Sequence, residues 1–448
     1  MSTSLILCCQ KSAMAIITTV VWLLLELVNI VLCIGYFLAL CLQHGRWHVR
    51  RRWLDPSAIK KVVVVGSGFG GLEAARHLGK DARLDVTMIS QRDFFEYVPG
   101  ILRLFCDPDM FWGMACALPR GNNDFLLGSV IALDSNSVSV QKLDGSTAAV
   151  SFDYLILAMG ADYRQPVTAS VGDSTMEARS ATWAREAEKV EQANSVIVLG
   201  GGAVGTELAA EIIDHYPEKA VTLITGAKSL VPSFPEKCIA KAHRWLKNRG
   251  VLLVLGERVE RFDDRSCTTT SGQSFEADIV FNCFGLKANT KSVSTGSLAS
   301  ALTGKQELQV RETLQLEGFD HIFAVGDVMT LPSGEIKQAF YAQLHGKAAA
   351  FNVSRHLSNK ELLRYPHDIV GSAQAPLVAI LSLGRFSGSL IFNSLVVNGF
   401  FAAVMKWFIE WSKVQEMRRR PVGLLLWKIG DEISFLLSRC CIRPPAVE

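Results

Sequence analysis

The chain has 448 residues, a formal net charge of +3 and a hydrophobic content of 49%. This length leaves room for two or three domains, and so small a charge gives no reason to expect a nucleic-acid partner. The positive mean hydropathy indicates a globular protein that also carries membrane-directed segments. The 11 cysteines contain no C-x-x-C pair and predict neither a disulfide framework nor a metal site.

A nearly unbroken apolar run, Ala13–Leu42, occupies the N-terminal part of the chain. It is long enough to span a bilayer and too long for the core of a signal peptide. Only Lys11 precedes it and several arginines follow at 46–52, so we expect the remainder on the cytosolic or equivalent side of a membrane. The sequence therefore predicts a single-pass anchor with its basic flank over residues 1–57. A buried core helix and a shallow hairpin are the alternatives, and the organelle stays open between endoplasmic reticulum, lipid droplet and mitochondrion.

The stretch Lys60–Gly71 combines four consecutive valines with a G-x-G-x-x-G pattern. The valines predict a buried parallel strand, and the glycines predict a tight turn into a helix, where the backbone approaches a pyrophosphate closely. The helix N-terminus adds free N–H groups and a partial positive charge. We therefore predict a dinucleotide site with contacts from Gly66, Gly68, Gly70 and Gly71.

The next strand is expected at Leu84–Ser90, and it ends without the acidic residue that usually holds the adenosine ribose. Ser90 stands in that position and Arg92 follows it. We expect this end of the site to use Ser90, Arg92 or the backbone. The following segment, residues 92–103, is either a packed loop or a wall of the cofactor site.

A second Gly-rich turn lies at Ser195–Gly205, again between an apolar strand and a predicted helix. The strand Ala220–Thr225 follows that helix. A fingerprint that recurs in the same structural context is far more specific than a single copy. The sequence therefore predicts a second dinucleotide site, with contacts from Gly200, Gly202 and Gly205.

Two charged residues near the second turn are candidates for cofactor recognition. The strand before Lys228 ends in Thr225 rather than in an acid, so a nearby cation would allow a 2′-phosphate, and both NADPH and NADH are expected. Glu207 stands in the first turn of the helix. It either stabilises the helix dipole or contacts the nicotinamide end.

Two later strands return the chain to the first sheet. Phe152–Gly160 ends in a glycine, Gly160, that is a further cofactor-binding candidate, and His321–Asp327 ends in a carboxylate. A helix is expected to begin near Lys337, with its N-terminus directed at the site. Lys337 is the polar candidate there, together with Gln343 and His345.

The C-terminal part is apolar and basic. Residues 392–411 are rich in Phe, Val and Trp, and residues 423–437 are apolar with interrupting charges, which is typical of an interfacial helix. Basic residues outnumber acidic ones between positions 406 and 443. This combination fits an anionic membrane surface, and the alternative is an apolar surface for self-association, for example in a homodimer.

Residues 60–383 resemble the type II NADH dehydrogenases and the apoptosis-inducing-factor-like flavoproteins, with the strongest likeness to the ferroptosis-suppressor branch. The motifs that carry the resemblance are GGGAVGTELAAEI, YPEKAVTLI, IFAVGD, KQAFYAQLHG and PLVAILSLGR. Two features depart from that branch: position 2 holds no glycine for myristoylation, and the C-terminal extension is longer and more apolar.

The resemblance implies an enzyme that passes electrons from NADH or NADPH through non-covalently bound FAD to a quinone at a membrane, without pumping protons. It implies that Asp327 holds the ribityl chain of FAD, that Glu207 serves the nicotinamide, and that Lys337 lies in the flavin–quinone region. Glu207 and Lys337 are therefore the expected catalytic residues. Reduction of a protein acceptor and an NAD(P)H-sensing role are the alternative functions.

The expected fold is α/β, with two Rossmann-like dinucleotide-binding domains of which the second is inserted in the first. The membrane-associated segments flank these domains. The expected order is the anchor 1–57, the first part of the FAD domain 58–170, the NAD(P)H domain 171–287, the second part of the FAD domain 288–370 and the C-terminal membrane-associated region 371–448.

Overall fold

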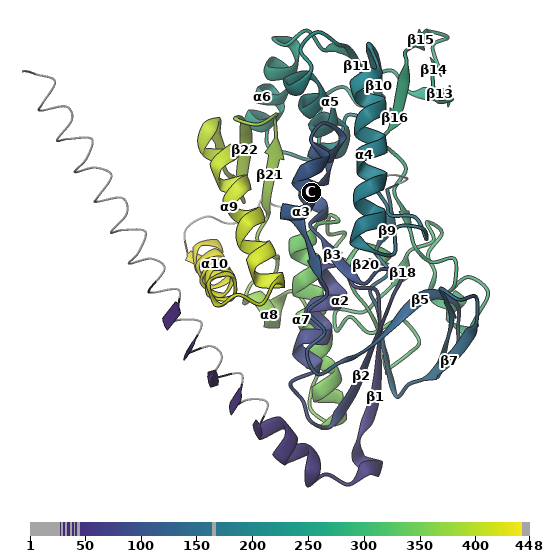
Figure 1. Ribbon diagram of the computed structural model, residues 1–448, viewed down its shortest axis with the longest axis vertical. Helices are drawn as coiled ribbons and strands as arrows, with labels where there is room; N and C mark the ends of the chain where they lie inside the picture. Colours follow the sequence, from purple (N-terminus) through teal and green to yellow (C-terminus); the bar gives the residue numbers. More distant parts are fainter. Residues whose placement is uncertain are drawn as a thin grey trace, which may run out of the picture.

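The computed structural model describes residues 45–163 and 167–440, together with isolated helical residues between positions 27 and 42 (Figure 1). Two parallel sheets lie toward opposite ends of the long axis, and the C-terminal helices pack on one side between them (Figure 1). The prediction of a spanning segment at Ala13–Leu42 falls largely outside the described residues. None of the helices formed by the described residues is both long and apolar enough to cross a bilayer.

The first sheet has the strand order β19-β8-β1-β2-β5-β6-β7. Its first five strands run parallel, and β6 and β7 add an antiparallel meander. Val62–Val65 are almost fully buried because both faces of the sheet are covered. In chain order the strands are β1 (Lys60–Val65), β2 (Leu84–Ser90), β5 (Asp124–Leu133), β6 (Ser137–Lys142), β7 (Thr147–Ser151), β8 (Tyr154–Leu157) and β19 (Ile322–Ala324).

The second parallel sheet is formed by chain that lies between β8 and β19 in sequence. Its order is β12-β11-β10-β16, with bounds β10 (Ser195–Leu199), β11 (Ala220–Thr225), β12 (Leu252–Leu255) and β16 (Ile279–Asn282). The expected α/β fold with a Rossmann-like sheet is therefore confirmed.

Short antiparallel and two-stranded sheets complete the strand content. The sheet nearest the C-terminus, β21-β22-β23, follows the two parallel sheets in sequence. The bounds are β3 (Phe94–Glu96), β4 (Ala115–Ala117), β9 (Ala161–Asp162), β13 (Val259–Phe262), β14 (Ser266–Thr269), β15 (Ser274–Glu276), β17 (Lys287–Ala288), β18 (Leu308–Gln309), β20 (Met329–Thr330), β21 (Val378–Ser382), β22 (Gly388–Phe392) and β23 (Leu395–Asn398).

The helices cover the sheets and form the C-terminal hairpin. The α-helices are α2 (Phe69–Leu78), α3 (Phe111–Met114), α4 (Met176–Gln192), α5 (Ala203–His215), α6 (Glu236–Lys247), α7 (Ala339–Leu357), α8 (His367–Val370), α9 (Phe400–Met417) and α10 (Pro421–Cys440). The 3₁₀ segments are η1 (Pro56–Ala58), η2 (Val98–Phe105), η3 (Pro108–Met110), η4 (Ser297–Ala301) and η5 (Gly326–Val328).

Two glycines let α2 and α7 touch backbone to backbone. A Cβ atom on Gly70 would lie 2.9 Å from the carbonyl oxygen of Ala342, and one on Gly346 would lie 2.2 Å from the carbonyl oxygen of Gly70. Any side chain at these positions would separate the helices. The close contact holds the N-termini of α2 and α7 beside the same sheet edge.

Candidate active site

A single cavity of about 1220 Å³ connects the first Gly-rich turn with the C-terminal helices. This volume exceeds the usual range of roughly 300–1,000 Å³ for one small-molecule pocket. Its wall includes residues from β1, α2, η2, α5, α7, β21, α9 and α10. The cavity therefore has room for a large cofactor and for a second ligand beside it.

The first turn has the geometry of a phosphate cradle. Gly66 has φ +107°, and a Cβ there would lie 2.2 Å from the carbonyl oxygen of Ala158. A Cβ on Gly71 would lie 1.9 Å from the carbonyl oxygen of Gly66. Gly68 caps α2 without a side-chain hydrogen bond, so the first N–H groups of the helix are free to bind an anion. Gly66, Gly68 and Gly70 line the cavity, and these residues fit a dinucleotide.

Ser90, which the sequence predicts at the adenosine end of the site together with Arg92, is the last residue of β2. Both line the cavity. The hydroxyl of Ser90 lies 2.6 Å from that of Ser67 and accepts a hydrogen bond from the backbone N–H of Arg92 over 3.2 Å. The Arg92 guanidinium lies 3.2 Å from Glu96, and burial lowers its pKa. A polar rim therefore stands where an acidic residue is more usual.

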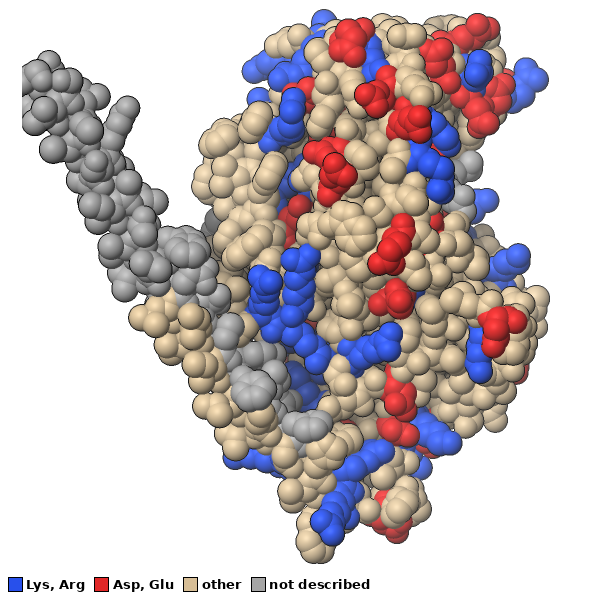
Figure 2. Space-filling view, viewed as in Figure 1, with Lys and Arg blue, Asp and Glu red and all other residues tan. Residues whose placement is uncertain are grey.

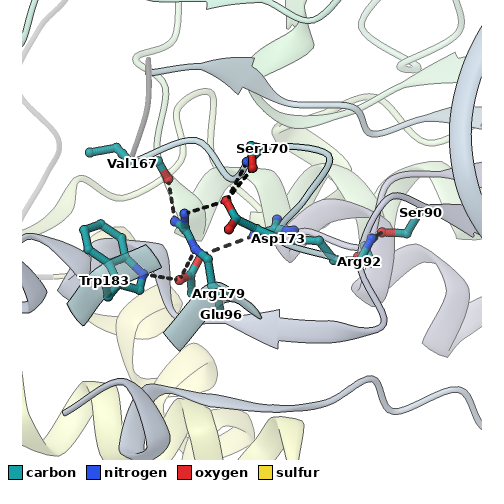
Figure 3. A network of polar contacts seen from close by, with 9 residues as sticks. Ser90, Arg92, Glu96, Val167, Ser170, Asp173, Arg179 and Trp183 are labelled. Carbon is teal, nitrogen blue, oxygen red and sulfur yellow. Dashed lines mark hydrogen bonds and ion pairs between the residues drawn. The ribbon is translucent and has the colours of Figure 1, made fainter. Parts of the chain in front are cut away.

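Behind Arg92 lies a buried network of charges, drawn in Figure 3. Arg179 of α4 is fully buried and donates to Glu96 over 2.9 Å, while the Trp183 indole N–H donates to the same carboxylate over 3.0 Å. Asp173 lies 3.4 Å from Arg179. The network ties the rim of the first site to the helix that opens the second nucleotide unit. Segment 92–103, expected as either a packed loop or a wall, serves both purposes, because η2 is largely buried and also lines the cavity.

Asp327 lies in the cavity wall immediately after β19. The phenol of Tyr163 donates to its carboxylate over 3.0 Å. Burial raises the pKa of Asp327, and the hydrogen bond from Tyr163 and the charge of Lys337 oppose that shift. Gly160, with φ +65°, lines the cavity close to Tyr163 in the chain. These residues fit the sugar-alcohol part of a flavin dinucleotide, which offers hydroxyl donors to a carboxylate.

Lys337 lines the cavity, but its ammonium group is already engaged. It lies 3.3 Å from Glu307 and contacts the carbonyl oxygen of Met329. α7 begins at Ala339 rather than at Lys337, because Gln338 has an extended backbone (φ −146°, ψ 147°). His345 accepts from the N–H of Gly326 and contacts Glu335 over 2.8 Å, which makes it a support for the η5 turn.

The second turn repeats the geometry of the first. A Cβ on Gly205 would lie 2.0 Å from the carbonyl oxygen of Gly200, which has φ +113°. Gly202 caps α5 without a side-chain hydrogen bond. Lys228 is exposed and lies outside the cavity wall. A Cβ on Gly226, two positions earlier, would lie 3.5 Å from Arg258, so a second cation borders this loop.

Glu207 extends from α5 into the cavity. The expectation that it stands in the first turn is wrong, because α5 begins at Ala203 and Glu207 falls in the second turn. It accepts a hydrogen bond from the backbone N–H of Ser382 over 2.5 Å, and burial raises its pKa to about 7. One turn further, the buried Glu211 lies 3.2 Å from Lys406 of α9 and 3.0 Å from the Ser382 hydroxyl. Helix α5 of the second unit therefore meets the C-terminal region at a buried group of charges.

Sequence reasoning missed several residues that lie in the wall of this cavity or form ion pairs with residues in it. Motif positions could not reveal them, because each acts through a partner distant in sequence: Tyr163 with Asp327, Arg103 with Glu410, and Lys406 with Glu211. The one sequence feature that could have identified such residues is a lone charge within an apolar stretch, as at Lys406 and Glu410.

The first Gly-rich turn lines the cavity, whereas Gly200, Gly202 and Gly205 of the second turn lie outside its wall, and that unit reaches the cavity through Ala203, Val204 and Glu207 of α5. Two such strand–turn–helix units beside one cavity define an oxidoreductase of the two-dinucleotide flavoprotein class. Residues 60–346 match the family described as pyridine nucleotide-disulphide oxidoreductase, and the chain belongs to that family. The predicted cofactors are thereby confirmed: the chain is an FAD-dependent oxidoreductase of pyridine nucleotides.

Curated relatives are similar over most of the chain. Ferroptosis suppressor protein 1 of Taeniopygia guttata is 30% identical over 370 residues, which cover 79% of this chain and 93% of that protein. Apoptosis-inducing factor homolog B of Dictyostelium discoideum is 26% identical over 375 residues, covering 77% and 93%. The resemblance stated from the motifs is therefore confirmed.

Solved structures share the fold at low identity. Sulfide:quinone oxidoreductase of Aquifex aeolicus superposes with a TM-score of 0.67 at 17% identity, covering 87% of this chain and all of that one. NDH2 of Plasmodium falciparum, solved in complex with NADH, superposes with a TM-score of 0.61 at 16% identity, covering 86% and 99%.

Proposed function

We propose that the chain oxidises NADH or NADPH with its FAD and passes the electrons to a quinone at a membrane surface, without pumping protons. The observation that carries the proposal is the single cavity, whose wall runs from the phosphate cradle at Gly66, past Asp327 and Glu207, to the C-terminal helices α9 and α10. One chamber thus adjoins both nucleotide units and an apolar exterior.

In this proposal the residues of the chain bind and orient the cofactor and the substrates. The free N–H groups at the start of α2 hold a pyrophosphate, and the carboxylate of Asp327 accepts hydrogen bonds from the ribityl hydroxyls. Glu207 positions the nicotinamide, and Lys337 contributes positive charge to the flavin–quinone region. Bound FAD supplies hydride acceptance and electron transfer, which side chains cannot perform.

The second unit accepts both NADH and NADPH in this proposal. β11 ends at Thr225, without the acid that selects a ribose 2′-hydroxyl. Lys228 and Arg258 border the loop that follows, and both are exposed. These two cations, with no acid at the end of β11 itself, favour a 2′-phosphate.

The acceptor is proposed to be lipid-soluble because the outer faces of α9 and α10 are apolar. Trp407 and Trp411 of α9 are 49% and 47% exposed. In Figure 2 few charged side chains lie over α9, and a group of Lys and Arg side chains borders this area. Aromatic side chains with neighbouring cations suit the headgroup level of a bilayer. The exposed apolar residues of the two helices are Phe400, Phe401, Val404, Trp407, Phe408, Trp411, Leu425, Ile429, Ile433 and Leu436.

We propose that both the N-terminal and the C-terminal parts of the chain bind the membrane. The apolar run Ala13–Leu42 would add a single-pass anchor, with the catalytic part on the cytosolic or equivalent side. Removal of residues 1–57 should release much of the protein from membranes. The remaining binding should be lost when Trp407→Ser and Trp411→Ser are added. Leu143→Ser, which alters an exposed apolar residue of the first unit, is the matched control and should leave binding unchanged.

Steady-state assays with different acceptors test the acceptor class. A short-chain ubiquinone should support turnover with either nucleotide, whereas cytochrome c should not. Turnover with a protein acceptor but not with a quinone would show that the physiological acceptor is a protein, and would contradict this proposal. A dimer in solution that dissociates in the Trp407 and Trp411 variant would show that α9 mediates self-association instead.

A further inference from the structure

Helix α10 closes one side of the cavity. Trp427, Gly430, Asp431 and Ser434 of this helix line it. The contact with α9 is close, because a Cβ on Gly423 would lie 2.2 Å from the backbone nitrogen of Glu416. The side chains of α10 are therefore held at fixed positions in the cavity wall.

The neighbouring cation, Lys413 of α9, is almost completely buried at 1% side-chain exposure and also lines the cavity. Its ammonium group contacts the carboxylate of Glu416 and lies 3.6 Å from the centre of the Trp427 ring. Lys413 is thus already neutralised by Glu416. It does not form an ion pair with Asp431.

The carboxyl group of Asp431 forms no hydrogen bond or ion pair with any residue in the described part of the chain. The charged groups that act on it come from three neighbouring helices: Lys413 and Glu416 of α9, Lys347 of α7, and Glu73 and Arg76 of α2. Burial raises the pKa of Asp431 to about 6; the cations Lys413 and Lys347 oppose this shift, and the two glutamates add to it. Roughly one Asp431 group in ten therefore carries a proton at pH 7, and about half do at pH 6.

The other carboxylates discussed in this cavity are already engaged. Asp327 accepts from Tyr163, Glu207 accepts from the backbone of Ser382, and Glu410 pairs with Arg103. Asp431 differs from all three, because it lines the cavity and its carboxyl group has no hydrogen-bond or ion-pair partner among the described residues. It also lies on the apolar helix pair through which a quinone would enter.

We propose that Asp431 is a catalytic residue of quinone reduction, donating a proton to a quinone oxygen in the part of the cavity beside α10. The inference rests on the proposed function. The overall reaction, NAD(P)H + H⁺ + quinone → NAD(P)⁺ + quinol, needs two electrons and two protons at the quinone. The C4–H bond of the nicotinamide supplies both electrons and one proton. The O–H bond of Asp431 breaks as the second quinol O–H bond forms, and water then returns a proton to the carboxylate.

The variants Asp431→Asn, Asp431→Glu and Glu432→Gln test this role in the full-length FAD-loaded protein. Glu432 is the exposed neighbour of Asp431 and serves as the matched control. With a short-chain ubiquinone, Asp431→Asn should reduce the rate about 100-fold, whereas Glu432→Gln should not and Asp431→Glu should retain most of the activity. Ferricyanide accepts electrons without protons, so its rate should be unchanged in all three.

The pH profile adds an independent readout. The wild-type quinone rate should fall as pH rises above about 6, because the protonated carboxyl group is lost, and this fall should be absent in Asp431→Asn. Bleaching of the flavin by NADH should be unaffected. An Asp431→Asn variant with normal FAD content, a quinone rate within about twofold of wild type and an unchanged profile would overturn this inference alone. A wild-type protein that reduces no quinone would remove the proposed function and this inference together.

Discussion

Tyr163 and Asp327, distant in sequence, meet in the cavity wall, where the phenol donates to the carboxylate over 3.0 Å. Tyr163 follows β9, and Asp327 follows β19 at the edge of the first sheet. The contact orients one carboxylate oxygen and leaves the other available to a ligand. It gives Asp327 a defined position before any cofactor binds.

Replacement of Asp327 should therefore weaken the binding of FAD. Asp327→Ala removes an acceptor for the ribityl hydroxyls and leaves the Tyr163 hydroxyl unpaired, at a cost of about 1–3 kcal/mol. FAD affinity should fall by roughly 5- to 150-fold, and the protein should purify largely colourless. Absorbance of the purified protein and titration with FAD measure the loss. Asp320→Ala, at an exposed carboxylate in the preceding turn, is the control, and equal FAD content in both variants would remove this assignment.

Charge reversal at Lys228 should discriminate between the two nicotinamide cofactors. In Lys228→Glu a carboxylate would face the 2′-phosphate of NADPH, and the KM for NADPH should rise about tenfold while that for NADH changes little. Arg258→Glu should act in the same direction. Lys247→Glu, an exposed lysine at the end of α6, provides the control. Equal effects on both nucleotides would mean that Lys228 does not contact the phosphate.

The buried pair of Arg179 and Glu96 should be essential for stability. Arg179→Met breaks a buried ion pair and leaves the Glu96 carboxylate with Arg92 and Trp183 as partners. Because Arg92 still compensates part of the charge, we expect a loss of about 3 kcal/mol, the low end of the range for breaking a buried pair. Thermal and urea unfolding of the FAD-loaded protein measure the change. The exposed pair of Lys189 and Glu186 is the comparison, and Lys189→Met should cost less than about 1 kcal/mol. Similar losses in both variants would contradict the assigned role.

The raised pKa of Glu207 should make stability depend on pH. The folded protein holds the Glu207 proton up to about pH 7, whereas the unfolded chain releases it near 4.5. The folded state therefore binds more protons in this window, and the free energy of unfolding should decrease as pH rises from about 4.5 to 7. Glu207→Gln should flatten that decrease by up to about 3 kcal/mol. Melting curves between these pH values, with Glu218→Gln as the exposed control, give the comparison; an unchanged slope in Glu207→Gln would contradict the prediction.

The elements that hold the nucleotides follow from local sequence. β2 and β11 have the expected bounds, because apolar runs between turn residues leave one choice of strand. The two Gly-rich turns lie where the glycines indicate, since a Cβ on Gly71 or Gly205 would collide with a carbonyl oxygen. These constraints act within one strand–turn–helix unit, so they can be read without the tertiary structure.

The remainder of the site depends on contacts that no local pattern encodes. Lys406 meets Glu211 because β21 packs against both α9 and α5, and Arg103 of η2 meets Glu410 of α9 although the two residues are distant in sequence. In the sequence, Asp431 is only a charge that interrupts an apolar run. Its place in the cavity wall depends on how α10 packs. Lys337 lines the cavity as its sequence position suggests, and its ion pair with Glu307 is a further contact that no local pattern encodes.

The most direct test follows the flavin absorbance of the purified full-length protein under anaerobic conditions. NADH or NADPH should bleach the flavin band, and a short-chain ubiquinone added afterwards should restore it rapidly with formation of quinol. Recovery with quinone would support the donor, the cofactor and the acceptor in one experiment. Bleaching that persists after quinone addition, with recovery only on exposure to oxygen or a protein acceptor, would contradict the proposed function.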